Sequence, residues 1–192
     1  MTEPYNPKIE SITFSDLPQF AMEELDRARR ELAEVPDPTL FNFLIDDSHL
    51  NFEGQNSKAL FAELSAAVPN GRNVVYIIKP VDEGSTAIGL IRTLFEESKK
   101  SKDGRSRDNR RLSPCLYVGS SSKMATRMKE HLGSGSRLTY ALKLLEWLPM
   151  DDFPIQLTCA LYPLGTPATV IRALEDALWD RLQPMFGRKG PR

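Results

Sequence analysis

Apolar residues recur at helical spacing in two stretches of the first 70 residues. Ser15 and Asp16 form a helix start, and the apolar positions that follow are Phe20, Leu25, Ala28 and Leu32. A short apolar segment covers 40–44, and a second helical stretch runs over 57–68. The turn signal Pro69-Asn70-Gly71 comes next. We therefore expect a helical N-terminal arm over residues 1–70 and a separate module over residues 71–192.

Short β-rich runs alternate with helical patterns after the turn. We expect strands over 74–78, 115–118 and 155–162, each rich in apolar and β-branched residues. We expect helices over 85–100, 122–132 and 137–148. A last helix opens at Thr166 and Pro167 and ends before Pro184. The order is that of a mixed α/β (α+β) chain, with a helix and a loop inserted over 81–113.

The composition is that of an ordinary soluble protein, with 41% hydrophobic and 27% charged residues. No apolar run approaches the length of a membrane span, and the acidic N-terminus does not resemble a signal peptide. Cys115 and Cys159 each lie in an apolar strand-like run, which suits buried thiols in a reducing compartment. We expect a cytoplasmic protein without a membrane partner and without a structural zinc.

Charge is distributed unevenly although the net charge is only −1. Residues 1–70 hold 5 Lys/Arg and 13 Asp/Glu, whereas residues 71–192 hold 20 and 13. Residues 99–111 alone contain seven bases and two acids. A basic module attracts polyanions by counterion release, so the second part is expected to meet phosphate groups. The simpler alternative is a solvated loop and two differently charged surfaces without a ligand.

Three polar residues lie on or beside apolar helix faces. Arg127 and His131 are four residues apart on the helix over 122–132, so both project from one side at the edge of its apolar stripe. They could line a cleft that holds an oxyanion, or they could both face solvent. Glu175 falls on the apolar face of the last helix. A carboxylate there needs a cation, a metal or a cleft, and a buried ion pair with an arginine would satisfy it too.

Taken together, these residues resemble the GIY-YIG nuclease family. Val74-Val75-Tyr76 stands where the family has its Gly-Ile-Tyr strand, and Tyr117-Val118-Gly119-Ser120-Ser121 matches the second motif. Arg127 comes ten residues after Tyr117, and His131 four residues later, as in many members. Glu175 lies on a helix after a third strand, and Gln183-Pro184-Met185-Phe186 resembles the family's closing segment. The match covers about residues 73–187.

This resemblance implies a small, three-stranded, mainly antiparallel sheet flanked by helices, and it implies hydrolysis of phosphodiester bonds. Glu175 would hold one divalent cation, Mg²⁺ or Mn²⁺. Arg127 would grip the scissile phosphate. Tyr76 would orient or deprotonate the attacking water, although an unperturbed tyrosine has a pKa near ~10 and needs help to lose its proton. Tyr117 and His131 would complete the proton network.

The sequence departs from the family pattern at three places. The first motif lacks its glycine, a long insertion separates Tyr76 from Tyr117, and Gly187 stands where an asparagine is usual. Restriction enzymes of the family carry insertions at this point, so we expect a restriction or phage-defence endonuclease. The alternatives are a structure-specific DNA repair nuclease and a catalytically idle module that binds DNA or protein.

We expect DNA as the partner and a homodimer formed through the N-terminal arm. The bases expected to contact DNA lie in the inserted loop, beside the second motif and near the C-terminus. They are Lys99, Lys100, Lys102, Arg105, Arg107, Arg110, Arg111, Lys123, Arg188 and Lys189.

Overall fold

The computed structural model describes residues 15, 17–100, 108–134 and 139–189, with the side chains of 99 and 100 left out. The chain divides into two compact units, residues 1–35 and 36–192. The first unit contains α1 (Leu17–Ala33), in which no described residue is buried. The division at residue 35 replaces the boundary expected at residue 70, because residues 39–67 belong to the second unit, where a strand and a helix pack on the sheet.

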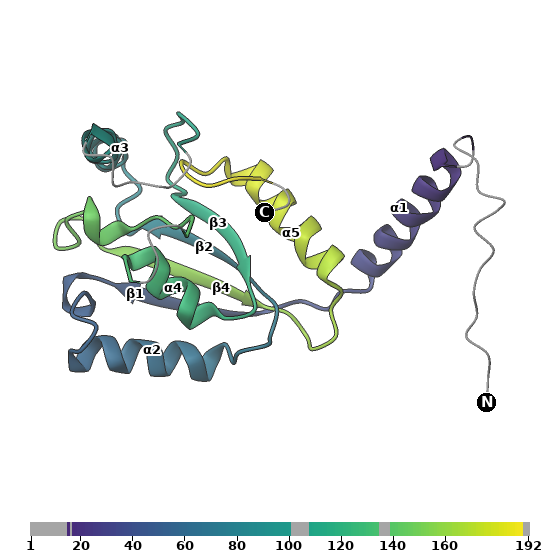
Figure 1. Cartoon of the computed structure of the whole chain (residues 1–192), viewed down its shortest axis with the longest axis horizontal. Helices are drawn as coiled ribbons and strands as arrows, with labels where there is room; N and C mark the ends of the chain where they lie inside the picture. Colours follow the sequence, from purple (N-terminus) through teal and green to yellow (C-terminus); the bar gives the residue numbers. More distant parts are fainter. Residues whose placement is uncertain (1–14, 16, 101–107, 135–138, 190–192) are drawn as a thin grey trace. The chain divides into compact units, whose positions relative to one another are not determined.

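The second unit is built on a four-stranded sheet of β1 (Thr39–Ile45), β2 (Val74–Pro80), β3 (Tyr117–Ser121) and β4 (Ile155–Leu161). The strand order is β1-β4-β2-β3, and every neighbouring pair is antiparallel (Figure 1). The expected mixed α/β class is confirmed, but the expected three strands are four. The additional strand is β1, which pairs with all seven residues of β4.

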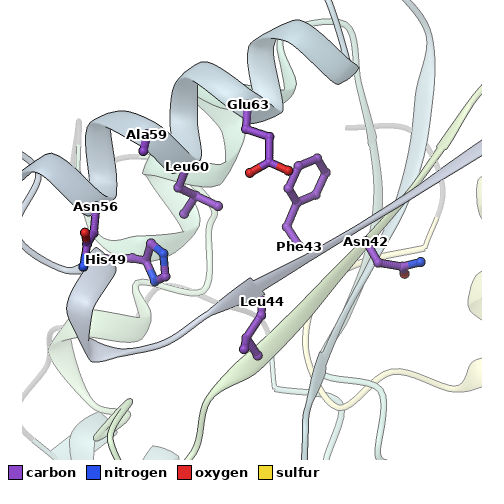
Figure 2. Close-up of a pocket in the computed structure, with 8 residues that line it drawn as sticks. All are labelled: Asn42, Phe43, Leu44, His49, Asn56, Ala59, Leu60 and Glu63. Carbon is purple, nitrogen blue, oxygen red and sulfur yellow. The ribbon is translucent and has the colours of Figure 1, made fainter.

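Successive strand residues point to opposite faces of this sheet. Figure 2 shows the alternation in β1, where Phe43 points toward α2 (Gln55–Ala67) while Asn42 and Leu44 point away from it. The face that carries Phe43 is the α4 face, because α4 (Met124–Leu132) also covers it through His131. The opposite face is the α5 face, which α5 (Ala168–Leu182) partly covers.

Residues 108–116 and 184–187 run beside the sheet at its β3 edge. The N–H groups of Met185 and Phe186 donate to the carbonyls of Cys115 and Leu116, at 2.8 and 3.0 Å. On the other side, Asn109 N–H donates to the carbonyl of Met185 at 3.0 Å. Residues that come just before β3 are therefore held by the segment that follows α5, and the edge of the sheet is partly covered.

The inserted helix is α3 (Ser85–Lys100), with the bounds that the sequence predicted. Its Phe95 is fully buried and packs on Phe186 and Trp147, with ring centroids 4.2 and 5.2 Å away. Arg92 of α3 forms a bidentate ion pair with Asp108, at 2.5 and 2.9 Å. Both contacts attach the insertion to the rest of the unit.

The helix expected over 137–148 is wrong. Residues 135–138 lie outside the described part, and 139–148 contain only the short 3₁₀ helix η4 (Leu144–Glu146). Side chains take the hydrogen bonds that a helix backbone would use. Leu142 N–H donates to His131 Nδ1 at 3.2 Å, and Leu142 C=O accepts from Trp147 Nε1 at 2.8 Å. Lys143 then adopts a left-handed conformation with φ of 54°, which a helix does not allow.

Candidate functional site

Tyr76 lies at the centre of a polar cluster on the α4 face. It stands opposite Gly119 of β3 in the antiparallel register. A Cβ atom at Gly119 would lie 2.7 Å from the Tyr76 hydroxyl and 2.8 Å from the ring of Tyr117. Only glycine leaves room here for both tyrosines, whose rings stack with centroids 6.0 Å apart. The glycine of the second motif thus has a direct packing role.

His131 reaches the Tyr76 oxygen from α4. Its Nε2 lies 2.9 Å from that oxygen, and its Nδ1 accepts the N–H of Leu142. A backbone N–H can only donate, so Nδ1 carries no proton and Nε2–H donates to Tyr76. His131 and Tyr76 are both 0% exposed. The sequence placed His131 at the edge of the apolar stripe of its helix, where it could face a cleft or solvent. In the structure it is fully buried and does not face solvent.

Arg127, one turn before His131, donates to four acceptors. Its Nε donates to the Tyr76 hydroxyl at 3.2 Å, and Nη2 donates to the Tyr117 hydroxyl at 3.1 Å. Its Nη1 donates to Glu130 at 2.8 Å, and Nη2 also donates to the carbonyl of Tyr140 at 2.8 Å. The guanidinium joins two strands, α4 and the segment that follows α4 into a single network.

The surroundings of Arg127 keep its guanidinium charged. Burial lowers its pKa, but electrostatic interaction with Tyr76 and Tyr117 and the hydrogen bonds to Glu130 and Tyr76 raise the pKa by more, so the balance lies above the ordinary value. The oxygen of Tyr76 receives two N–H donors, one from this cation and one from His131. Two donors aimed at one phenolic oxygen stabilise negative charge on it.

Gly187 closes the cluster beside Tyr117. Its φ is +101°, and a Cβ atom there would lie 2.8 Å from the Tyr117 ring. An asparagine at this position would be strained and would collide with the tyrosine. The glycine at this position is thus matched to the packing around Tyr117.

Glu175 lies apart from these four residues. It is half-buried on the α5 face, where Ser120 Oγ donates to its Oε2 at 2.6 Å. Together they line an open pocket of about 410 Å³. The other lining residues are Asn73, Ser121, Ser122, Ala168, Ile171 and Arg172. Ser120 follows Gly119 directly, so the two sites lie on opposite faces of the same edge strand.

The pocket of Glu175 suits a hard cation in its chemistry. It offers one carboxylate, three serine hydroxyls and an amide, and Mg²⁺ commonly binds through one carboxylate while it keeps several waters. The described residues contain no group of three His, Cys, Asp or Glu side chains that could enclose a metal. The donor set therefore fits a loosely held Mg²⁺ or Mn²⁺ and does not fit a closed structural site.

A chain segment covers the cluster around Tyr76. The carbonyl of Tyr140 accepts a hydrogen bond from Arg127, and the N–H of Leu142 donates one to His131. The exposed fraction of Tyr117 is only 3%. A phosphate group can reach Arg127 only if this segment moves or if the phosphate replaces one of its contacts.

Five of the ten bases expected to contact DNA have described side chains. Arg110, Arg111, Arg188 and Lys189 line one pocket of about 450 Å³, and Lys123 is exposed just before α4. Lys99 and Lys100 end α3, but their side chains are outside the described part. The remaining three, Lys102, Arg105 and Arg107, lie outside the described residues.

Two partners in these sites were missed from the sequence. Glu130 binds Arg127, and its position three residues later on the same helix is an ion-pair spacing that could have indicated it. Ser120 binds Glu175 and belongs to the second motif, but a serine hydroxyl carries no signal of its own.

Among the described residues, no helix is long and apolar enough to cross a membrane.

A further pocket of about 250 Å³ lies between β1 and α2 and contains none of the predicted site residues (Figure 2). His49 and Glu63 are its titratable residues. The His49 ring is held by Asp46, whose Oδ1 lies 2.9 Å from Nδ1. The same two residues form a capping box, in which Asp46 N–H donates to His49 Nδ1 at 3.3 Å, so the histidine has a structural role in the turn before α2.

The chain matches no family model, no curated protein and no solved structure in the three comparisons.

Proposed function

We propose that the protein is a metal-dependent DNA endonuclease of the GIY-YIG type that hydrolyses phosphodiester bonds. The observation that carries the proposal is the convergence on one phenolic oxygen. Tyr76 from β2 receives N–H donors from Arg127 and His131, and Tyr117 from β3 shares the same guanidinium. These are four of the five residues on which the family resemblance rests.

In the proposed reaction Tyr76 orients the attacking water and accepts its proton. For this step Tyr76 has to be the phenolate before the attack, and its negative charge is stabilised by the Arg127 cation and by Nε2–H of His131. The phenolate becomes neutral as it takes the proton of the water, and the hydroxide forms the new bond to phosphorus as the bond to the leaving oxygen breaks. Arg127 exchanges one of its protein acceptors for a phosphoryl oxygen, for which its planar fork is suited. Residues of the Glu175 pocket would hold the Mg²⁺, which would supply positive charge to a phosphate lying at the edge of β3, the strand whose opposite faces carry the two sites.

A second candidate is a catalytically idle module that binds DNA or protein. It is favoured by the burial of Tyr76 and by the way in which protein acceptors occupy the donors of Arg127. The pocket of Glu175 is lined by none of Tyr76, Tyr117, Arg127 and His131, which also favours the idle module. Under this reading the tyrosine network is a buried polar network that stabilises the sheet.

Cleavage of supercoiled plasmid with Mg²⁺ or Mn²⁺ separates the candidates. We expect the wild type to cut and EDTA to stop it, while Glu175→Ala loses at least about a hundredfold in rate. Arg181→Ala is the matched control for the fold of α5, since it removes an exposed side chain of the same helix that does not line this pocket. An inactive wild type, or a Glu175→Ala variant as active as the wild type, would overturn the proposed mechanism.

The biological setting belongs to the same proposal. A single module with an insertion suits a cytoplasmic restriction or phage-defence enzyme, which would produce discrete plasmid fragments. A repair nuclease would instead cut only flaps or branches. We further propose a homodimer formed through α1, in which no described residue is buried. Its exposed large apolar side chains are Leu17, Phe20, Met22, Leu25 and Leu32.

A further inference from the structure

A second polar pocket lies between the inserted segment and the C-terminal end of α5. Its volume is about 450 Å³. We call it the Arg111–Trp179 pocket, after two of the residues that line it. The others that line it are Asp108, Asn109, Arg110, Gly187, Arg188 and Lys189.

Two residues that line this pocket each carry a buried nitrogen with no hydrogen-bond partner among the described residues. They are Nη1 of Arg111 and Nε1 of Trp179. The guanidinium lies over the indole ring, 5.2 Å from its centroid, so the two groups are held together. Guanidinium and indole nitrogens only donate, and a ligand that satisfies both must be an acceptor. An oxyanion fits that requirement best, because it brings several acceptor oxygens and negative charge.

The acidic groups nearby are already engaged. Asp108 is bound by both terminal nitrogens of Arg92, and Asp180 pairs with Lys189. Arg110 and Arg111 form no ion pair with any described residue. Lys189 is neutralised by Asp180, but Arg110 and Arg111 present positive charge that no described carboxylate pairs with, which favours an anion.

The wall of the pocket is rigid before any ligand arrives. Asn109 is fixed on both sides, by N–H to Met185 C=O and by Nδ2 to Pro184 C=O, each at 3.0 Å. Arg110 has a left-handed φ of 53°, and its N–H donates to Asp108 Oδ1 at 2.7 Å. A strained residue held this firmly keeps the side chains of 110 and 111 in a set geometry, as a preformed binding site requires.

The pocket also shares a wall with the tyrosine cluster. Gly187 lines it, and the same glycine packs on the ring of Tyr117. Trp179 and Glu175 lie four residues apart on α5, on one side of that helix. An extended polyanion lying along the β3 edge would therefore pass the proposed catalytic residues and this pocket.

We propose that the Arg111–Trp179 pocket binds a non-scissile backbone phosphate of the DNA that the enzyme cuts. The proposal rests on the proposed function only in taking DNA as the substrate. The chemistry recognised is a phosphate oxyanion, which a free nucleotide or inorganic phosphate also carries, so the test has to separate these sources.

The test measures binding without cleavage, by fluorescence anisotropy of a labelled duplex in Ca²⁺ over a range of salt concentrations. Arg111→Gln should weaken binding about tenfold and reduce the slope of log Kd against log salt by about 0.9, the value for one phosphate. Trp179→Phe, which keeps an aromatic ring and removes the N–H, should weaken binding to a smaller extent. Arg181→Gln removes an exposed charge from the same helix as Trp179, and it should change neither the affinity for DNA nor the salt slope.

A duplex series with one neutral methylphosphonate at each position locates the contact. At one position the modification should remove the difference between the wild type and Arg111→Gln. Micromolar binding of inorganic phosphate or of a mononucleotide, lost in Arg111→Gln, would identify the free ligand as the source and overturn the backbone proposal. An unchanged slope in a folded Arg111→Gln protein would also overturn it.

The two proposals fail separately. If the wild type cuts DNA and Arg111→Gln binds DNA as the wild type does, the pocket proposal fails and the nuclease proposal stands. If the wild type never cuts DNA but Arg111→Gln binds DNA with one phosphate contact fewer, the nuclease proposal fails and the pocket proposal stands.

Discussion

Gly119 gives the sharpest test of the tyrosine cluster, because a single methyl group there meets both rings. In Gly119→Ala the new Cβ would lie 2.7 Å from the Tyr76 oxygen and 2.8 Å from the Tyr117 ring. An ordinary contact needs about 3.4 Å, so one of the groups must move by roughly 0.7 Å. Tyr76 is fully buried and bound by two donors, and it has no free direction in which to move.

The cost follows from that displacement. Overpacking of a rigid core costs about 1–3 kcal/mol. The hydrogen bonds from Arg127 to the two tyrosines are already 3.1 and 3.2 Å long, so a further shift of this size breaks at least one of them. We expect the free energy of unfolding to fall by about 2–3 kcal/mol, and cleavage to fall about a hundredfold from misplacement of the proposed base.

Urea denaturation measures the first quantity and initial plasmid cleavage rates measure the second. Gly89→Ala is the matched control, because the same methyl group meets nothing within 4 Å there and lies within α3. It should stabilise the protein by about 0.5–1 kcal/mol and leave cleavage unchanged. A Gly119→Ala protein as stable and as active as the wild type would refute the close packing on which the cluster depends.

Three further outcomes are expected. Tyr76→Phe leaves two buried N–H donors unpaired, so unfolding free energy should fall by about 2–4 kcal/mol in a urea titration, and cleavage should stop. Unchanged stability would contradict the network. Burial raises the pKa of the Cys115 and Cys159 thiols to about 12. The stability from these neutral thiols is present below their unfolded pKa near ~8.5 and is lost as pH rises toward 12. At pH 8 a thiol reagent should label neither cysteine until the protein unfolds. Leu25→Asp should convert a dimer into a monomer in sedimentation without loss of cleavage of nicked DNA, whereas a wild type already monomeric would exclude α1 as the interface.

Helical spacing alone brought Arg127 and His131 to one side of a helix, and the structure places both in the cluster with Tyr76. The three residues are far apart in the chain, and only the antiparallel register of β2 and β3 explains how Tyr76 and Gly119 meet. The register is set by long-range backbone pairing, which single-sequence periodicity does not contain.

Two errors have the same physical origin. β1 was not recognised because Leu40 and Leu44 on its outer side are apolar, so its sequence lacks a polar-apolar alternation. Residues 139–148 are apolar at helical spacing, but their backbone groups bond to His131 and Trp147 instead. In both cases a tertiary contact overrides the local pattern. Glu175 was expected with the other four residues, but its partner is Ser120 on the opposite face, a pairing that spacing along α5 could not indicate.

The hydrogen bond from Leu142 N–H to His131 Nδ1 makes one backbone amide sensitive to whether the segment that covers the Tyr76 cluster is in place. This amide donates to a side-chain nitrogen, so its hydrogen exchange is controlled by the contact between the covering segment and the site. A ligand that displaces the segment will speed exchange at this one amide while β2 and β4 remain protected. A ligand that binds over the closed segment will slow it. Exchange at Leu142, followed during addition of uncleavable DNA, thus measures the opening of the site directly, in a protein without any label.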